Sequence, residues 1–358
     1  MKTLIKTAAL SISLASALIF ISCNSSAGLP QSNSVQPTRD YRIMFYNVEN
    51  LFDIEDDPAI DDAEYLPTAE KKWTKERYQK KLDNIASVIV ALGEGALPDV
   101  IGFAEIENRD VLEDLLDKTI LKKSDYKIIH KDSPDERGID VACLYRTSKV
   151  KPIFFETIRV DLGAGSRPTR DILYCQLLLK GADTLHFFVN HWPSRSGGEE
   201  QSAPKRAIAA QTVKAKVDQL LAKNPSANII LTGDFNDDPA NNSLAKDLNA
   251  GLLGDKSKTL TNLTLRMQMN KLPGTLKYKG NWNYFDQFIV SKSFFDKKGL
   301  ETSDLNYFIF SGPENNRFLL EQDTRYQGFE PFRTYHGSQF HDGYSDHLPV
   351  YVDLSWQK

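Results

Sequence analysis

Several apolar runs in this 358-residue sequence stop abruptly at carboxylates, amides or imidazoles. Such side chains can bind a hard divalent cation, orient water and carry protons, which are the requirements of hydrolytic chemistry. A single polar ending would mean little, because Asp and Asn commonly begin turns. Six endings are harder to explain as turns, and we expect them to form one site: Asn47 with Glu49, Glu105, Asn190 with His191, Asp234 with Asn236, Asp286, and Asp346 with His347.

Apolar strands and amphipathic helices alternate along the chain, which is the pattern of a layered α/β protein. In such proteins, ligands gather beyond the ends of strands. No internal repeat or linker divides Tyr41 from Trp356, so one domain is expected there. The predicted strands are 41–48, 99–106, 126–131, 140–146, 172–179, 185–192, 228–235, 284–291 and 348–355.

Three helices are expected between these strands. After Thr74, a suitable N-cap, apolar residues recur every three or four positions until the glycines of 93–95 end the helix. Asn108 is placed to cap a second helix. A third is expected after Ser202, because Pro204 would then lie in its first turn, where proline is tolerated.

Residues 1–22 have the features of an export signal. Two lysines precede an apolar run that is too short for a comfortable membrane span. The run ends in FISC, which resembles the bacterial lipobox, so Cys23 is the expected lipidation site; a plain signal peptide with an incidental cysteine is the alternative. Residues 23–40 are predicted to form a flexible tether. The chain would then be lipid-anchored in the bacterial cell envelope, at the periplasm-facing side or the cell surface.

Composition and charge restrict the possible functions. Apolar residues make up 41% and charged residues 26%, as in ordinary globular proteins. A formal net charge of −4 argues against a high-affinity nucleic-acid-binding module, but not against an enzyme whose bound cation supplies positive charge. The Asp-rich stretch 53–70 is interpreted as a solvated loop, with a calcium loop as the alternative. Cys143 and Cys175 are expected to be buried free thiols rather than a disulfide.

Seven motifs follow one another between Tyr41 and Val352: YNVENLF, IGFAEIEN, RGIDVACLYR, VNHWPSR, TGDFND, NYFDQFIVS and YSDHLPV. In this order they resemble the motif series of the endonuclease/exonuclease/phosphatase (DNase I-like) superfamily, with GDFN and the later SDH as the most specific pair. For residues 41–358, the resemblance implies a four-layered α/β sandwich. Two packed β-sheets would be flanked by helices, with the site at one rim.

The resemblance also implies a metal site with oxygen ligands. Glu105 would be the principal ligand of Mg²⁺ or Mn²⁺, since a hard cation keeps several waters and needs few protein ligands. Asn47, Glu49 and Asp346 would complete or support the site. For Glu105 and Glu49, a surface carboxylate at a strand end is the alternative.

Two histidines would act on the scissile phosphate. By the resemblance, His347 would activate or stabilise the attack, while Asp286 accepts its other ring proton and fixes the tautomer. His191 would contact the phosphate or protonate the leaving oxygen, with Asp140 orienting it. A core histidine and a strand-start carboxylate are the alternatives for His191 and Asp140.

The remaining implied roles concern water and substrate. Asp234 and Asn236 would orient the attacking water and hold a phosphoryl oxygen. Flanking phosphates, a base or a headgroup would be contacted by Asn190, Arg170, Arg195, Arg333 and Tyr335. Solvated arginines, and a loop that packs its own aromatic residues, are the alternatives.

Three functions are therefore considered. The leading one is a Mg- or Mn-dependent phosphodiesterase, a monomeric extracytoplasmic endonuclease that hydrolyses DNA or RNA. The second is a phosphatase or a phospholipid or inositol-phosphate phosphodiesterase with the same site. The third is a catalytically silent, lipid-anchored binding protein, which is disfavoured because no catalytic position is replaced.

Overall fold

The computed structural model describes residues 39–313 and 316–357. The predicted export signal, Cys23 and nearly all of the tether predicted over 23–40 lie outside the described residues. Within the described part of the chain, none of the helices combines the length and the apolar character needed to cross a membrane.

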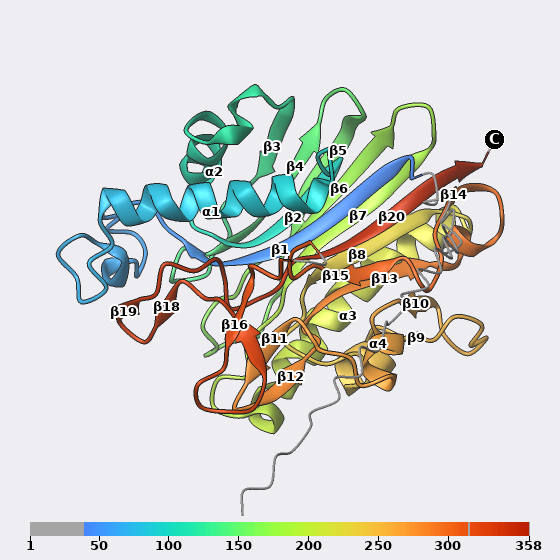
Figure 1. The fold of residues 1–358 in the computed structure, drawn as a ribbon. Coiled ribbons are helices and arrows are strands. Elements are labelled where there is room, and N and C mark those ends of the chain that lie inside the picture. Colours follow the sequence, from blue (N-terminus) through green and yellow to red (C-terminus); the bar gives the residue numbers. More distant parts are fainter. Residues whose placement is uncertain (1–38, 314–315, 358) are drawn as a thin grey trace, which may run out of the picture. The chain divides into compact units, whose positions relative to one another are not determined.

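The first of two large β-sheets contains seven strands (Figure 1): β1 (Tyr41–Leu51), β2 (Val100–Ile106), β3 (Tyr126–His130), β4 (Asp140–Arg146), β14 (Gly299–Glu301), β15 (Tyr307–Ile309) and β20 (Val350–Gln357). Their order is β14-β20-β1-β2-β4-β3, and β15 also pairs with β20. The pair β1 and β2 is parallel, while the other pairs in this sheet are antiparallel.

The second sheet has a similar plan, with a parallel pair inside a largely antiparallel sheet. Its strands are β5 (Val150–Ile158), β6 (Ile172–Leu179), β7 (Thr184–His191), β8 (Asn228–Asp234), β9 (Ala250–Gly251), β10 (Leu260–Asn262) and β13 (Asp286–Ser291). They follow the order β5-β6-β7-β8-β13-β10-β9. The central β7 and β8 are parallel, as are β9 and β10 at one edge.

Helices cover the outer faces of both sheets, which gives four layers (Figure 1). On the first sheet lie α1 (Lys75–Gly93) and α2 (Arg109–Asp117); on the second lie α3 (Glu199–Lys223) and the π-helical turn η3 (Ser243–Asp247). The short helices are η1 (Ala63–Tyr65), η2 (Ile120–Lys123), α4 (Leu265–Met269) and η4 (Lys292–Phe295). The predicted four-layered α/β sandwich is confirmed.

Alternation along the strands divides the apolar residues among separate cores. In β1, Phe45 packs between the two sheets, whereas its neighbours Met44 and Tyr46 pack against α1, because successive strand residues point to opposite faces. A sheet covered on both faces needs continuous apolar runs, which explains the pattern seen in the sequence. Cys143 and Cys175 lie in the core between the sheets as buried free thiols, as expected.

The helix boundaries confirm the expected end of α1 and the cap of α2, and they correct the start of α3. Asn108 caps α2, because its side chain accepts a hydrogen bond from the Val111 N–H. The predicted start of α3 was wrong: the helix begins at Glu199, so Pro204 lies inside it. In α1, Gly93 is the last helical residue, and the left-handed cap conformation belongs to Glu94.

The edge strand β5 was not predicted from the sequence. It contains Pro152, which lacks an N–H for strand pairing, and its register with β6 shifts there. Most of its side chains are exposed or half-buried. A strand of this kind does not show the buried apolar pattern by which the other long strands were recognised.

Strand direction determines which polar residues meet at the rim. Asp286 begins β13 rather than ending a strand, but β13 is antiparallel to β8, so Asp286 pairs with Asp234. Asp234 also pairs with His191 at the end of β7. Three two-stranded hairpins accompany the sheets: β11 (Leu276–Tyr278) with β12 (Asn281–Asn283), β16 (Leu320–Gln322) with β17 (Phe329–Pro331), and β18 (Tyr335–His336) with β19 (Gln339–Phe340).

One glycine allows β7 and β8 to approach closely just before the rim. Gly233 has a φ of +152°, and a Cβ at this position would lie 2.2 Å from the carbonyl oxygen of Asn190. Any side chain would therefore push the backbones apart. The glycine of the GDFN motif is thus explained by the close backbone contact that places Asp234.

Candidate active site

A single buried amide joins the acidic residues of the two sheets. Asn47 comes from β1 of the first sheet, beside the strand that carries Glu105. Its Nδ2 donates to Glu105 Oε1 at 3.2 Å and to Asp234 Oδ2, in the second sheet, at 3.1 Å. Its Oδ1 accepts the Glu49 N–H at 3.1 Å. Asn47 is fully buried, and the predicted convergence of the two sheets on one site is present in the structure.

Three site residues have a left-handed backbone conformation, which residues other than glycine rarely adopt. The φ angles of Glu49, Glu105 and Asn236 are +53°, +65° and +50°. Each such residue costs on the order of 1–3 kcal/mol and persists only where its surroundings hold it. The Asn50 N–H donates to Glu105 Oε2 at 2.9 Å, and this hydrogen bond fixes the orientation of the Glu105 carboxylate. Backbone strain therefore accompanies the orientation of these side chains.

His347 makes the hydrogen bond expected from the sequence. Its Nδ1 lies 2.7 Å from Asp286 Oδ2, and its Nε2 lies 3.8 Å from Asp234 Oδ2. Burial lowers the pKa of His347, but the carboxylates of Asp286 and Asp234 outweigh burial and raise this pKa well above its usual value. A charged imidazolium at this point can stabilise negative charge on a phosphoryl group.

His191 has the opposite electrostatic character. Burial, followed by the nearby charge of Arg170, holds the pKa of His191 well below its usual value, so its imidazole is neutral. Its Nε2 lies 3.9 Å from Glu105 Oε1 and 3.7 Å from Asp234 Oδ2. Among the described residues, its Nδ1 has no hydrogen-bond partner.

The expected pairing of Asp140 with His191 was wrong. Asp140 Oδ2 lies 3.2 Å from the Nε2 of His130, and its Oδ1 accepts the Ser133 N–H at 2.8 Å. Asp140 begins β4, which pairs with β3, so it reaches the histidine on that neighbouring strand rather than the one in the second sheet. The carboxylate therefore stabilises the segment that follows β3.

Asp234 is poised to exchange a proton near neutral pH. Burial raises the pKa of its carboxyl to about 7, against the opposing effect of the His347 charge. Its Oδ1 accepts the Asn236 N–H at 2.9 Å, while the Asn236 Nδ2 donates to the Trp192 carbonyl at 3.0 Å. Asp234 thus has the properties of a group that can orient and deprotonate water.

Four carboxylates line a cavity of about 370 Å³ beside this centre: Glu49, Glu64, Glu105 and Asp346. Glu64 forms an ion pair with Lys71 at 3.3 Å. The side chains of Glu105 and Asp346 are 17% and 24% exposed, so both can reach a hydrated ion. Glu49 is engaged by the Thr334 N–H at 2.7 Å and is better placed to support the site than to bind directly. This oxygen-rich, partly hydrated set fits a hard divalent cation, which Glu105 and Asp346 would hold.

Lys81 balances the charge below this cavity and was missed in the sequence. Its buried Nζ donates to Thr334 Oγ1 at 2.5 Å and to the Tyr344 carbonyl at 2.7 Å, which ties α1 to the segment before the SDH motif. Burial lowers the pKa of Lys81 to about 8, although Glu49 opposes this shift. A signal was present, because Lys81 lies three residues after Tyr78 and hence on the apolar face of its helix.

Three predicted substrate contacts are instead structural. Asn190 is fully buried and bonds the Thr232 carbonyl and the Trp192 indole. Arg170 is buried against Asp135 at 3.1 Å and donates to the Trp192 carbonyl. Arg195 donates to the Asn236 carbonyl and to neighbouring acidic and amide side chains after β8, and also to Glu199 at the start of α3. Asn190 and Arg170 are therefore buried, and Arg195, whose side chain is 21% exposed, has its donors engaged by protein groups.

Arg333 and Tyr335 lie at the cavity, but mainly in contact with protein. Arg333 Nη2 donates to Asp346 Oδ2 at 2.8 Å, and its Nε lies 3.4 Å from Glu49 Oε1. Tyr335 is buried, packs beside Trp73 and donates its hydroxyl to the Lys71 carbonyl. The alternative of a loop that packs its own aromatic residues is therefore correct for Tyr335.

The four-layered sandwich thus brings carboxylates, an amide and histidines together at one rim. The model of the Endonuclease/Exonuclease/phosphatase family matches residues 42–356. This chain belongs to the endonuclease/exonuclease/phosphatase family. Members of this superfamily are phosphoester hydrolases that generally depend on divalent metal ions. No match was found among curated proteins.

Solved structures of low sequence identity share the fold. The mannosyl-6-phosphatase Bt3783 of Bacteroides thetaiotaomicron is 17% identical, with a TM-score of 0.55 over 88% of this chain and 99% of that one. A humanised D. rerio TDP2 is 14% identical, with a TM-score of 0.54 over 88% and 98% of the two chains. The human Nocturnin catalytic domain is 17% identical, with a TM-score of 0.52 over 88% and 94%.

His347→Ala should lower turnover by roughly two to four orders of magnitude, the range for losing a positioned acid or base. His347→Gln should show a similar loss while still donating a hydrogen bond to buried Asp286, which protects folding. Steady-state rates on an active substrate, with circular dichroism for folding, measure both. His186→Gln, in the same strand as His191 but hydrogen-bonded to Tyr174, is the matched control. A loss of less than about threefold in folded His347→Ala would contradict the assignment.

Lys81→Met should change how stability depends on pH. The folded chain releases the Lys81 proton near pH 8 and the unfolded chain near pH 10.5, so between these values the folded state binds fewer protons. The free energy of unfolding of the wild type should therefore rise, relative to Lys81→Met, by on the order of 1 kcal/mol per pH unit in this window. Urea unfolding at several pH values measures the difference.

Lys80→Met provides the matched control for this prediction, because the side chain of Lys80 is 48% exposed. Its stability should follow the wild type at every pH. If the free energies of unfolding of the wild type and Lys81→Met change in parallel between pH 8 and 10, the pKa of Lys81 is not lowered by burial.

Proposed function

We propose that this chain is a divalent-metal-dependent phosphodiesterase that acts outside the cytoplasm as an endonuclease on DNA or RNA. The observation that carries the proposal is the contact of Asn47 with both Glu105 and Asp234, beside the pair formed by His347 and Asp286. This contact brings an oxygen-rich cation site and two differently charged histidines to one rim. Hydrolysis of a phosphoester needs such groups around a single phosphorus.

The side chains of this chain divide the reaction among them. Water, oriented by Asn236 and Asp234, attacks phosphorus, and Asp234 accepts the water proton. The leaving-group bond breaks as the new oxygen–phosphorus bond forms, and the leaving oxygen takes a proton from solvent. The imidazolium of His347 stabilises charge on a phosphoryl oxygen, and Asp286 holds its tautomer. The neutral His191 is suited to contact the phosphate rather than to protonate the leaving oxygen. A bound Mg²⁺ or Mn²⁺ would supply further charge neutralisation beside Glu105.

Two motifs support a nucleic-acid substrate. YNVENLF and VNHWPSR resemble those of the extracellular nuclease-like bacterial branch of the family. Their residues Asn47 and His191 lie at the rim beside Glu105, whose side chain is 17% exposed. The acidic chain would then bind its substrate through the catalytic ion rather than through a basic surface.

A phosphatase is the second candidate, because the rim also contains a defined cavity. The cavity of about 370 Å³ is walled by the aromatic residues Tyr65, Trp73 and Tyr335 beside Glu105. This volume falls within the range of small-molecule sites. A phosphorylated sugar or nucleotide would place one phosphate at the catalytic centre and its remaining atoms in this cavity.

The purified protein should hydrolyse plasmid DNA or RNA with Mg²⁺ or Mn²⁺, and excess chelator should abolish this activity. Parallel assays with sphingomyelin, inositol phosphates and a phosphorylated sugar distinguish the candidates. Glu105→Gln, which keeps the shape of the side chain, should lower the rate by a factor on the order of 100 or more and raise the Mg²⁺ concentration needed. Equal hydrolysis in chelator would reject the metal role, and turnover of small phosphomonoesters alone would reject the nuclease assignment.

We also propose that a lipid on Cys23 anchors the chain in the bacterial cell envelope as a monomer. The proposal rests on the short apolar leader and on the lipobox-like FISC sequence. Cells fed a palmitate analogue should label the full-length wild type and not Cys23→Ala. Immunoblotting provides the control for equal expression. Labelling of both proteins would remove the lipoprotein assignment.

A further inference from the structure

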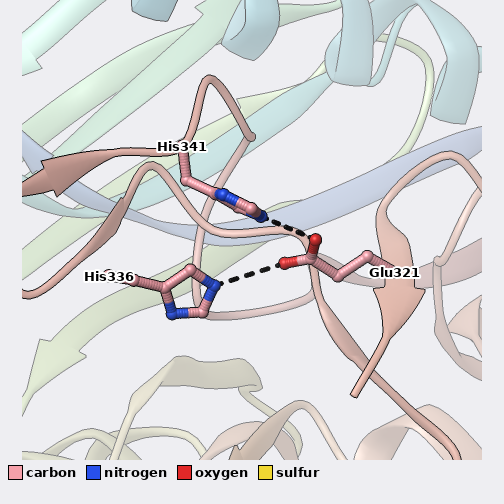
Figure 2. A group of neighbouring side chains, drawn as sticks. All are labelled: Glu321, His336 and His341. Carbon is pink, nitrogen blue, oxygen red and sulfur yellow. Dashed lines mark hydrogen bonds and ion pairs between the residues drawn. The ribbon is translucent and has the colours of Figure 1, made fainter. Parts of the chain in front are cut away.

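Two histidines and a glutamate converge outside the catalytic centre. Glu321 lies in β16, His336 in β18 and His341 directly after β19, and Figure 2 shows their side chains pointing toward one another. The Nε2 of His341 is 2.6 Å from Glu321 Oε2, and the Nε2 of His336 is 3.6 Å from Glu321 Oε1. One ligand atom from each residue lies within 4.8 Å of the other two. The cluster thus joins two hairpins.

The carboxylate of Glu321 is not satisfied by protein alone. Its Oε1 is buried from solvent and has no hydrogen-bond partner among the described residues. The facing Nε2 of His336 is too distant at 3.6 Å for a hydrogen bond. A buried carboxylate oxygen without a partner is costly. A cation between this oxygen and the two imidazoles would remove that cost.

The donor set favours a borderline transition metal over a hard cation. Zn²⁺ binds imidazole nitrogen and carboxylate oxygen at about 2.0–2.2 Å, so tetrahedral ligand atoms lie about 3.3 Å apart. The observed separations of 2.6 and 3.6 Å are on either side of this value. All three side chains are partly exposed, with values of 24–33%, so an ion can enter and water can complete its coordination.

We propose that Glu321, His336 and His341 form a Zn²⁺ site that clamps the β18–β19 hairpin to β16. The site is separate in chemistry from the catalytic centre, where carboxylates and amides gather. It is nevertheless adjacent, because Arg333 lines both the catalytic cavity and the cavity of about 560 Å³ that contains the cluster. Tyr335, next to His336, forms part of the catalytic wall. The clamp would therefore hold that wall in place.

A second histidine–carboxylate group in the chain provides an internal comparison. His130, Asp132 and Asp140 also lie close together, but Asp140 is already engaged by Ser133 as well as by His130. The side chain of Asp132 is 84% exposed. This group has the partners expected of an ordinary hydrogen-bonded turn. It therefore serves as a control for zinc binding elsewhere.

The test measures zinc rather than catalysis. Chelator-stripped protein is dialysed against buffered Zn²⁺ in excess Mg²⁺, which occupies the carboxylate site, and bound zinc is counted by elemental analysis. The wild type, Asp132→Asn and Glu105→Gln should each retain one Zn²⁺ per chain. His336→Gln and His341→Gln keep a polar amide beside Glu321 but lose the imidazole ligand. Each should lower zinc affinity more than about 100-fold, since mutation of even the supporting residues of metal sites lowers affinity 10–100-fold.

Two further readouts test the location and the clamp. Co²⁺ should give the visible absorption of a tetrahedral nitrogen- and oxygen-ligated ion in the wild type, and this absorption should be absent in both histidine variants. Zn²⁺ should raise the melting temperature of the wild type and leave that of the variants unchanged. The absence of stoichiometric zinc in the wild type would overturn the proposal. Equal retention by His336→Gln and His341→Gln, or loss in Asp132→Asn, would overturn it as well.

Discussion

The buried amide of Asn47 is the contact on which the catalytic rim depends. It donates to a carboxylate from each sheet, Glu105 and Asp234, and accepts the backbone N–H of Glu49. The carboxylates of Glu105 and Asp234, which come from opposite sheets, would otherwise repel each other without an intervening donor. An amide has the required pair of N–H groups and an acceptor, and it adds no charge. The same hydrogen bonds of Asn47 thus hold the two sheets together at this rim and place the catalytic groups.

Charge balance around that amide explains the surrounding residues. Asp286 and Asp234 keep His347 protonated, whereas burial and Arg170 keep His191 neutral. Two residues of one type therefore acquire different functions from their environments, as in other acid–base sites. Below the carboxylate cavity, Lys81 supplies a buried cation, and the partly exposed Arg333 supplies a second positive charge at the cavity wall. The acidic residues are thereby held in place without being fully neutralised, which leaves a site suited to a cation.

The later part of the chain adds function around this centre. Hairpins between β15 and β20 contribute Arg333 and Tyr335 to the cavity wall. The proposed zinc clamp lies in the same hairpins, so one segment would connect a nitrogen-rich ion site to an oxygen-rich one. Short strands exposed to solvent have little apolar burial to stabilise them. A metal clamp is one physical means of stabilising such a segment next to a reaction centre.

The sequence determined the fold class and the long buried strands, because apolar periodicity is a local property of the chain. The pairing of His347 with Asp286, 61 positions apart, was expected only through the family resemblance of the motifs. The other long-range contacts could not be predicted from the sequence. Asp140 contacts His130 instead of His191. Arg170 and Arg195 donate their hydrogen bonds to neighbouring carbonyls and carboxylates. Lys81 reaches the site from a helix. Which donor meets which acceptor depends on strand order and direction across two sheets. Only the tertiary structure decides that, since each buried polar group must find whichever partner the packing brings within reach.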